Sequence, residues 1–410
     1  MKIKENIGIF IFTAVIGGVL IIGSLMNIGL VQKPIERLGD STIDFSQFVD
    51  EIKSAYVSDF SNKECFINLN GLFARITGRH VYNEVSVLEN GMLDYETLKE
   101  LDMTAFANSV IQFDAFLKEN GIAFLYAQVP NKSDLQDTLV REGIDNYGNR
   151  NANELIGLLE KTDTEILDLR QSISATPELV EKYFYNTDHH WNTHGAFVAF
   201  GELLQYLNEM FPAENIDLSL ADASNWSTEV YEDWFLGSRG KRVGIYFGGV
   251  DDLTIYMPNF ETDMSFYVPK HREYYSGSFA DAVIREKFLD APDYFNENPY
   301  CAYIGGDYPL VHHRNELVEN DLKVLIIKDS FSLPLQSFLS TAVKELDVLD
   351  PRYYTESTIS EYVAVSQPDI VIMLINPSVL ESSAYYHFGI PKEEEGIHKT
   401  ERTEISYFAK

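Results

Sequence analysis

The chain has 410 residues, of which 63 are acidic and 32 are basic, so its formal net charge is −31. Such a charge repels phosphate backbones, which argues against nucleic acid as a partner. It also disfavours binding of a free anionic polymer, unless a local basic patch binds it. The apolar fraction of 45% is that of a globular chain, and the two cysteines, Cys65 and Cys301, exclude a disulfide-stapled scaffold or a multi-cysteine metal site.

The first predicted element is an uncharged, strongly apolar segment at residues 6–32, which follows Lys2 and Lys4. A helix needs roughly 20 apolar residues to cross a bilayer, and lysines before it favour a cytoplasmic N-terminus. We therefore predict an uncleaved single-pass membrane anchor at residues 1–32. A cleaved signal peptide is the alternative, although no convincing small-x-small site follows. Either interpretation places residues 33–410 outside the cytoplasmic membrane.

Residues 33–100 are predicted to form a stalk and the first surface elements, and an α/β domain is predicted at 101–410. Helical periodicity is expected at 104–119, 153–161, 196–210 and 333–343. Buried strands are expected at 122–129, 164–169, 322–327, 346–349 and 369–375. Near-continuous apolar strands separated by helices are typical of a parallel sheet that is covered on both faces.

The pattern changes at residues 211–316, which are rich in Asp, Asn, Tyr and Gly. Short β-like runs occur there at 243–247 and 253–256. We interpret this stretch as a β-rich insertion within the α/β domain. The tail from residue 392 is charged and is predicted to be peripheral.

The first stretch that carries chemistry is Tyr-Asn-Thr-Asp-His-His-Trp-Asn-Thr-His-Gly-Ala at 185–196. Asp188 and His190 are two residues apart, so they share a side only if the segment is extended or turning. Thr193 is a plausible N-cap for the following helix, which puts the pair on the preceding loop. There the carboxylate would hold one imidazole nitrogen and leave the other free as a general base, while His189 would point away.

The second stretch is the strand at 322–327, which continues into Lys-Asp-Ser-Phe-Ser. Ser330 falls in the turn between this strand and a helix, at the sheet edge where α/β proteins bind ligands. Backbone N–H groups and the helix dipole at such a turn suit a developing oxyanion. Ser330, His190 and Asp188 would thus supply the nucleophile, the base and the group that orients the base.

Two other interpretations of these stretches stay open. Asp329 and Ser330 before a helix often act only as a cap, although Ser332 is the better cap candidate. Asp188 with His189, His190 and His194 offers enough ligands for a metal ion, although no H-E-x-x-H spacing is present.

The Asp-His-His-Trp stretch and the Lys-Asp-Ser-Phe-Ser stretch together resemble the DHHW proteins. These are relatives of the alginate O-acetylation proteins in the SGNH hydrolase superfamily, and the resemblance covers residues 101–377. It implies a flavodoxin-like, three-layer α/β sandwich, no cofactor, and a Ser-His-Asp triad in which Asp-x-His precedes the serine. Asp188 and His190 match the Asp-x-His element, and Ser330 matches the nucleophile.

SGNH enzymes usually add a glycine and an asparagine to the oxyanion hole. Residues 235–242 resemble the Gly-Ser segment that follows the DHHW helix in this family, which makes Gly237 the candidate glycine. Asn376, directly after the last predicted strand, is the candidate asparagine. An ordinary turn is the alternative for Gly237.

Four further polar residues are candidates for contact with the substrate. Asn131 and Lys132 follow the strand at 122–129, on the same sheet edge as Ser330. Arg239 and Arg242 are rare cations in an acidic chain and would suit a carboxylate or phosphate on the substrate. A plain surface role is the alternative for the two arginines.

The sequence therefore predicts an extracytoplasmic serine enzyme that forms an acyl-enzyme on Ser330. The resemblance implies acetyl as the acyl group, a cell-envelope or secreted glycan as acceptor, and a membrane-bound O-acyltransferase as the partner that supplies the donor. Transfer to a sugar hydroxyl and hydrolysis by water both stay open. The rival functions are a glycan-binding protein without activity and a metal-dependent envelope hydrolase. The net charge favours a neutral or amino-bearing glycan.

Overall fold

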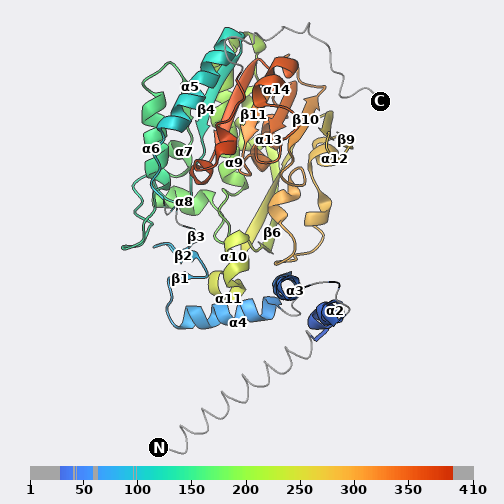
Figure 1. Ribbon diagram of the computed structural model, residues 1–410. Helices are drawn as coiled ribbons and strands as arrows, with labels where there is room; N and C mark the ends of the chain where they lie inside the picture. Colours follow the sequence, from blue (N-terminus) through green and yellow to red (C-terminus); the bar gives the residue numbers. More distant parts are fainter. Residues whose placement is uncertain are drawn as a thin grey trace, which may run out of the picture. The chain divides into compact units, whose positions relative to one another are not determined.

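The computed structural model describes residues 28–39, 42, 44–58, 63–95, 97 and 99–390 (Figure 1). Most of the predicted anchor at 1–32 and the predicted peripheral tail from 392 lie outside the described residues. Among the helices of the described ranges, none combines the length and apolarity that a membrane crossing requires. Contacts divide the chain into two units, residues 1–70 and 71–410.

The first unit contains helices α2 (Ile28–Gly39) and α3 (Phe45–Ser58), and α4 (Lys63–Ile76) begins in it. Arg37 on α2 forms an ion pair with Glu51 on α3, so the two helices pack as a pair. Cys65 on α4 is an exposed free thiol, and Cys301 in the second unit is also free.

The core of the second unit is an eight-stranded sheet in the order β5-β4-β13-β11-β12-β10-β8-β9. Its strands are β4 (Ala123–Gln128), β5 (Glu165–Asp168), β8 (Met264–Val268), β9 (Glu273–Gly277), β10 (Leu310–Asn315), β11 (Lys323–Lys328), β12 (Glu345–Leu349) and β13 (Ile370–Ile375). The first five strands in spatial order are parallel, as predicted. The prediction of a wholly parallel sheet was wrong, because β10, β8 and β9 add antiparallel strands at one edge.

The three antiparallel strands come from the predicted insertion at 211–316, which therefore extends the main sheet as well as covering it. Numbered along the chain, the five parallel strands lie in the order 2-1-5-3-4. The flavodoxin order is 2-1-3-4-5. The fold thus has flavodoxin-like layers, but its last strand, β13, lies at the centre between β4 and β11.

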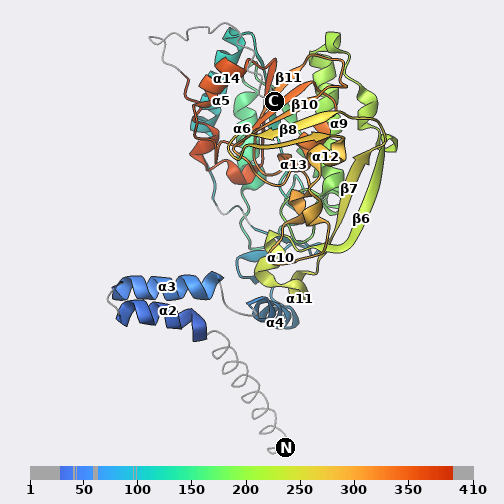
Figure 2. The same cartoon turned by 90° about the vertical axis from the view of Figure 1, so that its right-hand side faces the viewer.

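Helices cover both faces of this sheet, which gives the predicted three layers (Figures 1 and 2). On one face lie α5 (Thr104–Glu119), α6 (Gly148–Leu159) and α14 (Ile359–Ser366), which share a core with alternate strand residues such as Phe124 and Leu325. On the other lie α9 (Thr193–Met210) and α13 (Ser332–Leu339), which pack on the alternate set such as Leu125 and Ile326. The short helices α7 (Arg170–Ile173), α8 (Pro177–Tyr183) and α12 (Phe279–Val283) complete these layers.

Another part of the insertion forms a two-stranded ribbon, β6 (Trp226–Phe235) with β7 (Asp251–Pro258), which confirms the β-like run at 253–256. The run at 243–247 is helical instead, in α10 (Ser238–Val243) and α11 (Ile245–Gly248). Gly244, at φ 85°, separates these two helices, and Val243 and Phe247 both enter a small core with Leu93. Leu93 belongs to a separate sheet of β1 (Val81–Tyr82), β2 (Val85–Val87) and β3 (Leu93–Asp94).

Candidate active site

The loop between α8 and α9 carries Asp188 and His190, and a bridge between Phe184 and Trp191 closes it. The loop is therefore a tight turn, as the spacing of the pair predicted. Asn192 caps α9, because its side chain accepts a hydrogen bond from Gly195 N at 3.0 Å. The prediction of Thr193 as the N-cap was thus wrong by one residue.

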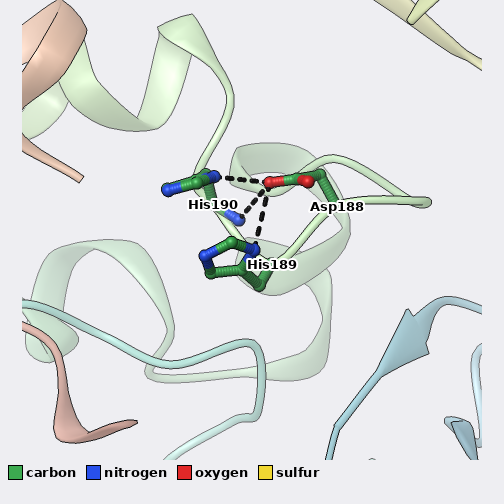
Figure 3. Close-up of side chains that lie close together, drawn as sticks. All are labelled: Asp188, His189 and His190. Carbon is green, nitrogen blue, oxygen red and sulfur yellow. Dashed lines mark hydrogen bonds and ion pairs between the residues drawn. The ribbon is translucent and has the colours of Figure 1, made fainter. Parts of the chain in front are cut away.

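Asp188, His190 and Ser330 form a continuous chain of hydrogen bonds. Asp188 Oδ1 lies 2.5 Å from His190 Nδ1, and His190 Nε2 lies 2.7 Å from Ser330 Oγ. The same Oδ1 accepts the backbone N–H of His190 at 3.0 Å, which fixes the carboxylate against the ring (Figure 3). The geometry is that of a nucleophile, a base and a group that orients the base.

A backbone N–H group also binds the second oxygen of the Asp188 carboxylate, the one that does not face His190. Ser238 N donates to Asp188 Oδ2 at 2.6 Å, and Gly237 packs so closely that an added Cβ would lie 2.3 Å from the Asp188 Cβ. Burial by itself would raise the pKa of Asp188, but the imidazoles of His189 and His190 lower it well below its usual range. Asp188 is therefore an ionised, fixed carboxylate at neutral pH.

Aromatic rings enclose the imidazole of His190. Tyr300 stacks on it at a centroid distance of 4.1 Å, and Phe331 lies 4.8 Å away. The Trp191 Nε1–H and the Tyr300 hydroxyl both donate to Phe331 O, which ties the loop to the turn that bears Ser330. Sequence reasoning missed Tyr300, because nothing in the insertion's spacing relates it to the histidine.

One residue, Asp329, separates Ser330 from the end of β11, and its carboxylate holds the turn in shape. Asp329 accepts the N–H of Phe331 at 2.9 Å and the N–H of Asn376 at 2.7 Å, so it joins the ends of β11 and β13. Burial raises the pKa of Asp329 to about 6. The Ser330 N–H has no hydrogen-bond partner within the part of the chain that the structure describes. Ser332 is the first residue of α13 rather than its cap.

The two residues that the resemblance assigns to the oxyanion hole have other hydrogen bonds here. Gly237 N donates to Thr187 Oγ1 at 2.8 Å. Asn376 N donates to Asp329, and its side-chain amide donates to Pro130 O at 2.6 Å. Both residues lie beside the candidate active site, where they position its loops.

The predicted substrate contacts lie in differing surroundings. Lys132 is buried, and its Nζ donates to Leu93 O at 2.7 Å, Asn186 O at 2.7 Å and Asp188 O at 2.8 Å. Burial lowers the pKa of Lys132 to about 8. The ammonium group thus holds the loop that bears Asp188, and it does not face an open cleft. Asn131 keeps a buried, unpartnered side-chain oxygen.

The two arginines flank Tyr95. The guanidinium of Arg239 lies 3.6 Å from the centre of the Tyr95 ring and that of Arg242 lies 4.9 Å from it. Arg239 NH1 also donates to Ser238 Oγ at 3.2 Å, close to the carboxylate of Asp188. Arg242 pairs with Glu84 farther out. Of the two arginines, only Arg239 donates a hydrogen bond to Ser238, the residue whose N–H binds the Asp188 carboxylate.

One group of three side chains in the described residues brings potential metal ligands together, namely Asp188, His189 and His190 (Figure 3). His194 does not join it, because its Nδ1 is 2.8 Å from the hydroxyl of Tyr256. Both oxygens of Asp188 already accept N–H groups, so the group fits hydrogen bonding better than a metal ion.

A charged cluster at the end of β11, the strand that leads to Ser330, was not foreseen. Lys328, at the end of β11, is buried and pairs with Asp307 and with Asp350 at 3.1 Å. Arg352 pairs with Asp350 at 2.6 Å. This cluster anchors the strand from which Ser330 emerges, and its only sequence signal was a lysine at the end of an apolar strand.

Comparisons with known proteins identify a related family and related folds. Residues 90–217 match the sequence profile of the family described as ALGX, SGNH hydrolase-like domain, acetyltransferase AlgX. This stretch contains Asp188 and His190, and the resemblance to the alginate O-acetylation proteins is thereby confirmed. No curated protein matches the chain.

Several solved structures share the fold, among them PatB1 and a DHHW family protein. PatB1 of Bacillus cereus, solved with a sulfonyl adduct, is 18% identical, with a TM-score of 0.61 over 74% of this chain and 99% of PatB1. A DHHW family protein from Eubacterium siraeum is 19% identical, with a TM-score of 0.53 over 74% of this chain and 94% of that protein. The chain therefore has an SGNH-like α/β fold with a mixed sheet.

Proposed function

We propose that this chain is an SGNH-type serine acyltransferase that O-acetylates a polysaccharide through an acyl-enzyme on Ser330. The observation that carries the proposal is the hydrogen-bond chain from Asp188 through His190 to Ser330 at the carboxyl edge of the parallel strands. The SGNH-like fold and the AlgX-type profile support an acetyltransferase-type role.

In the first half-reaction, His190 Nε2 takes the Ser330 hydroxyl proton as Oγ attacks the carbonyl carbon of the acetyl donor. The carbonyl oxygen becomes an oxyanion, to which the Ser330 N–H can donate a hydrogen bond. The intermediate collapses when the bond to the donor oxygen breaks, and His190 returns the proton to that oxygen. The ionised Asp188 stabilises the imidazolium between these two proton transfers.

In the second half-reaction, a sugar hydroxyl gives its proton to His190 and attacks the acetyl carbonyl. The ester to Ser330 breaks, and the proton passes from His190 to Oγ. Water in place of the sugar hydroxyl would make the enzyme an esterase. The AlgX-type profile, described as that of an acetyltransferase, supports the transferase of these two.

The proposal includes a location and a partner. The apolar segment at 6–32 would anchor the chain in the membrane and hold residues 33–410 on the outer side, beside an envelope or secreted glycan. A membrane-bound O-acyltransferase would then deliver the acetyl group. A neutral or amino-bearing glycan suits the net charge of −31 better than an anionic one.

A serine-reactive fluorophosphonate probe followed by peptide mapping tests the proposal. We expect labelling at Ser330 and hydrolysis of 4-nitrophenyl acetate, with faster turnover when a chito-oligosaccharide acceptor is added. Ser330→Ala should lower turnover by up to about a millionfold, as loss of a serine nucleophile does elsewhere. Ser332→Ala, which changes a hydroxyl that faces Gln336, is the matched control.

The outcomes separate the rival functions. Retained activity in Ser330→Ala would reject the acyl-enzyme. Absence of labelling together with glycan binding would favour a binding protein, and metal-dependent activity without labelling would favour the metal-dependent hydrolase. Labelling with no effect of the acceptor would make the chain an esterase.

A further inference from the structure

The oxyanion proposed above still lacks a second donor. Gly237 N–H and Asn376 N–H, the donors that the resemblance suggests, are bonded to Thr187 and Asp329. The Ser330 N–H is the one backbone donor identified so far. The oxyanion holes of acyl-transfer enzymes combine backbone N–H groups with donors such as Asn, Tyr or His side chains.

His189 lies directly beside Asp188 and His190, so the prediction that it points away was wrong. Its ring centroid is 3.8 Å from that of His190, and its side chain is 28% exposed, against 7% for His190. The Nδ1 atoms of both rings face the Asp188 carboxylate, so both Nε2 atoms lie on the other side (Figure 3). His190 Nε2 meets Ser330 Oγ on that side, so His189 Nε2 lies on the same side of the carboxylate as Ser330 Oγ.

The neighbours of His189 Nδ1 determine which nitrogen carries the proton. Arg239 NH1 donates to this Nδ1 at 3.3 Å, and Ser238 Oγ lies 3.1 Å from it. A guanidinium has donors and no acceptor, so Nδ1 must offer a lone pair. Asp188 Oδ1 is also 3.3 Å away, but it already accepts two N–H groups of His190. The neutral ring therefore holds its proton on Nε2.

The charge state of the ring supports this tautomer. Burial, the neighbouring His190 ring and Arg239 lower the pKa of His189 to about 4, against the pull of Asp188. The ring is thus neutral at neutral pH, with one N–H group. Stacking of Arg239 on Tyr95 at 3.6 Å fixes the guanidinium that selects the tautomer.

We propose that the Nε2–H of His189 is the second donor to the oxyanion that forms when Ser330 attacks the acetyl group. The inference rests on the proposed function of Ser330. His189 would then touch the reacting oxygen, and Arg239 would be a positioning residue that acts through the His189 tautomer.

Replacement of His189 by Phe and by Gln in the full chain tests the inference. H189F keeps a ring against His190 but removes the donor, so kcat for 4-nitrophenyl acetate should fall by about 10²–10³-fold with little change in KM. H189Q keeps an N–H donor and should recover part of that loss. The exposed His194 provides the matched control, H194F, which should keep the native kcat.

A second measurement does not depend on activity. The ¹⁵N-NMR spectrum of His189 should show an unprotonated Nδ1 and a protonated Nε2, and Arg239→Met should change the balance of the two tautomers. Native kcat in H189F, equal losses in H189F and H189Q, or a protonated Nδ1 would each overturn the inference. Activity retained in Ser330→Ala would instead reject the proposed function, so the two failures are distinguishable.

Discussion

At the residue scale, the contact between Gly237 and Asp188 decides the geometry of the candidate triad. Gly237 has φ −69° and ψ 176°, which any residue can adopt, so the backbone conformation does not require glycine. The lack of space does require glycine, because an added Cβ would lie 2.3–2.5 Å from three atoms of Asp188. Any side chain at this position must push the carboxylate away from His190.

We therefore expect Gly237→Ala to lower kcat by about 100-fold, since a shift near 1 Å of a catalytic group costs that much. The measurement is 4-nitrophenyl acetate turnover beside a denaturant unfolding curve. Gly157→Ala is the control, because no atom lies within 4 Å of its Cβ and alanine in a helix should add about 0.5–1 kcal/mol of stability. Native kcat in Gly237→Ala would show that the loop accommodates the methyl group.

At the element scale, strand β10 carries two histidines in opposite environments, as alternation along a strand requires. His312 bonds Asp347 at 2.6 Å, and Asp347 also accepts from Tyr362 on α14. His313 faces the other core, with its ring 5.0 Å from that of Phe266, and neither of its nitrogens has a partner among the described residues. Burial lowers the pKa of His313 to about 3.

This burial predicts a loss of stability in acid. The unfolded chain binds a proton at His313 near pH 6.5, whereas the folded chain resists it down to about pH 3. The free energy of unfolding should thus fall as pH drops through this window, by about 2 kcal/mol at pH 5. His313→Phe should remove that loss in denaturant curves at pH 7 and 5. His80→Gln, at an exposed histidine, is the control. If the free energy of unfolding of His313→Phe depends on pH in the same way as that of His80→Gln, the explanation is wrong.

At the scale of the whole molecule, the net charge of −31 would act on the proposed glycan acceptor before any contact forms. A polyanionic glycan is repelled on approach, whereas a neutral glycan meets no such barrier. Salt shortens the range of this repulsion, from about 10 Å at 0.1 M to 3 Å at 1 M.

We accordingly expect kcat/KM for a polyuronate acceptor to rise with NaCl concentration, and that for a neutral chito-oligosaccharide to stay level. Steady-state transfer rates at several NaCl concentrations give the comparison. A polyuronate rate that falls with salt would instead assign a receiving role to local cations such as Arg239 and Arg242.

The sequence predicted the five parallel strands and the candidate triad, because periodicity and two motifs carry that information locally. The antiparallel edge was missed, since the pairing of β10 with β8 and β12 joins residues far apart along the chain. The surroundings of Lys132 could not be predicted either. A lysine after a strand is typical of a ligand contact. The three carbonyl oxygens that surround Lys132 come from distant parts of the chain, and only the folded structure reveals them.

The central position of β13 has a consequence for biosynthesis. It is the last strand to leave the ribosome, yet it joins β4 to β11. Until residue 375 emerges, the β4–β5 and β11–β12 pairs have open strand edges that can pair with other chains. Ser330 and His190 therefore stay on separate, unfinished pieces, and the candidate triad assembles only when this strand closes the sheet.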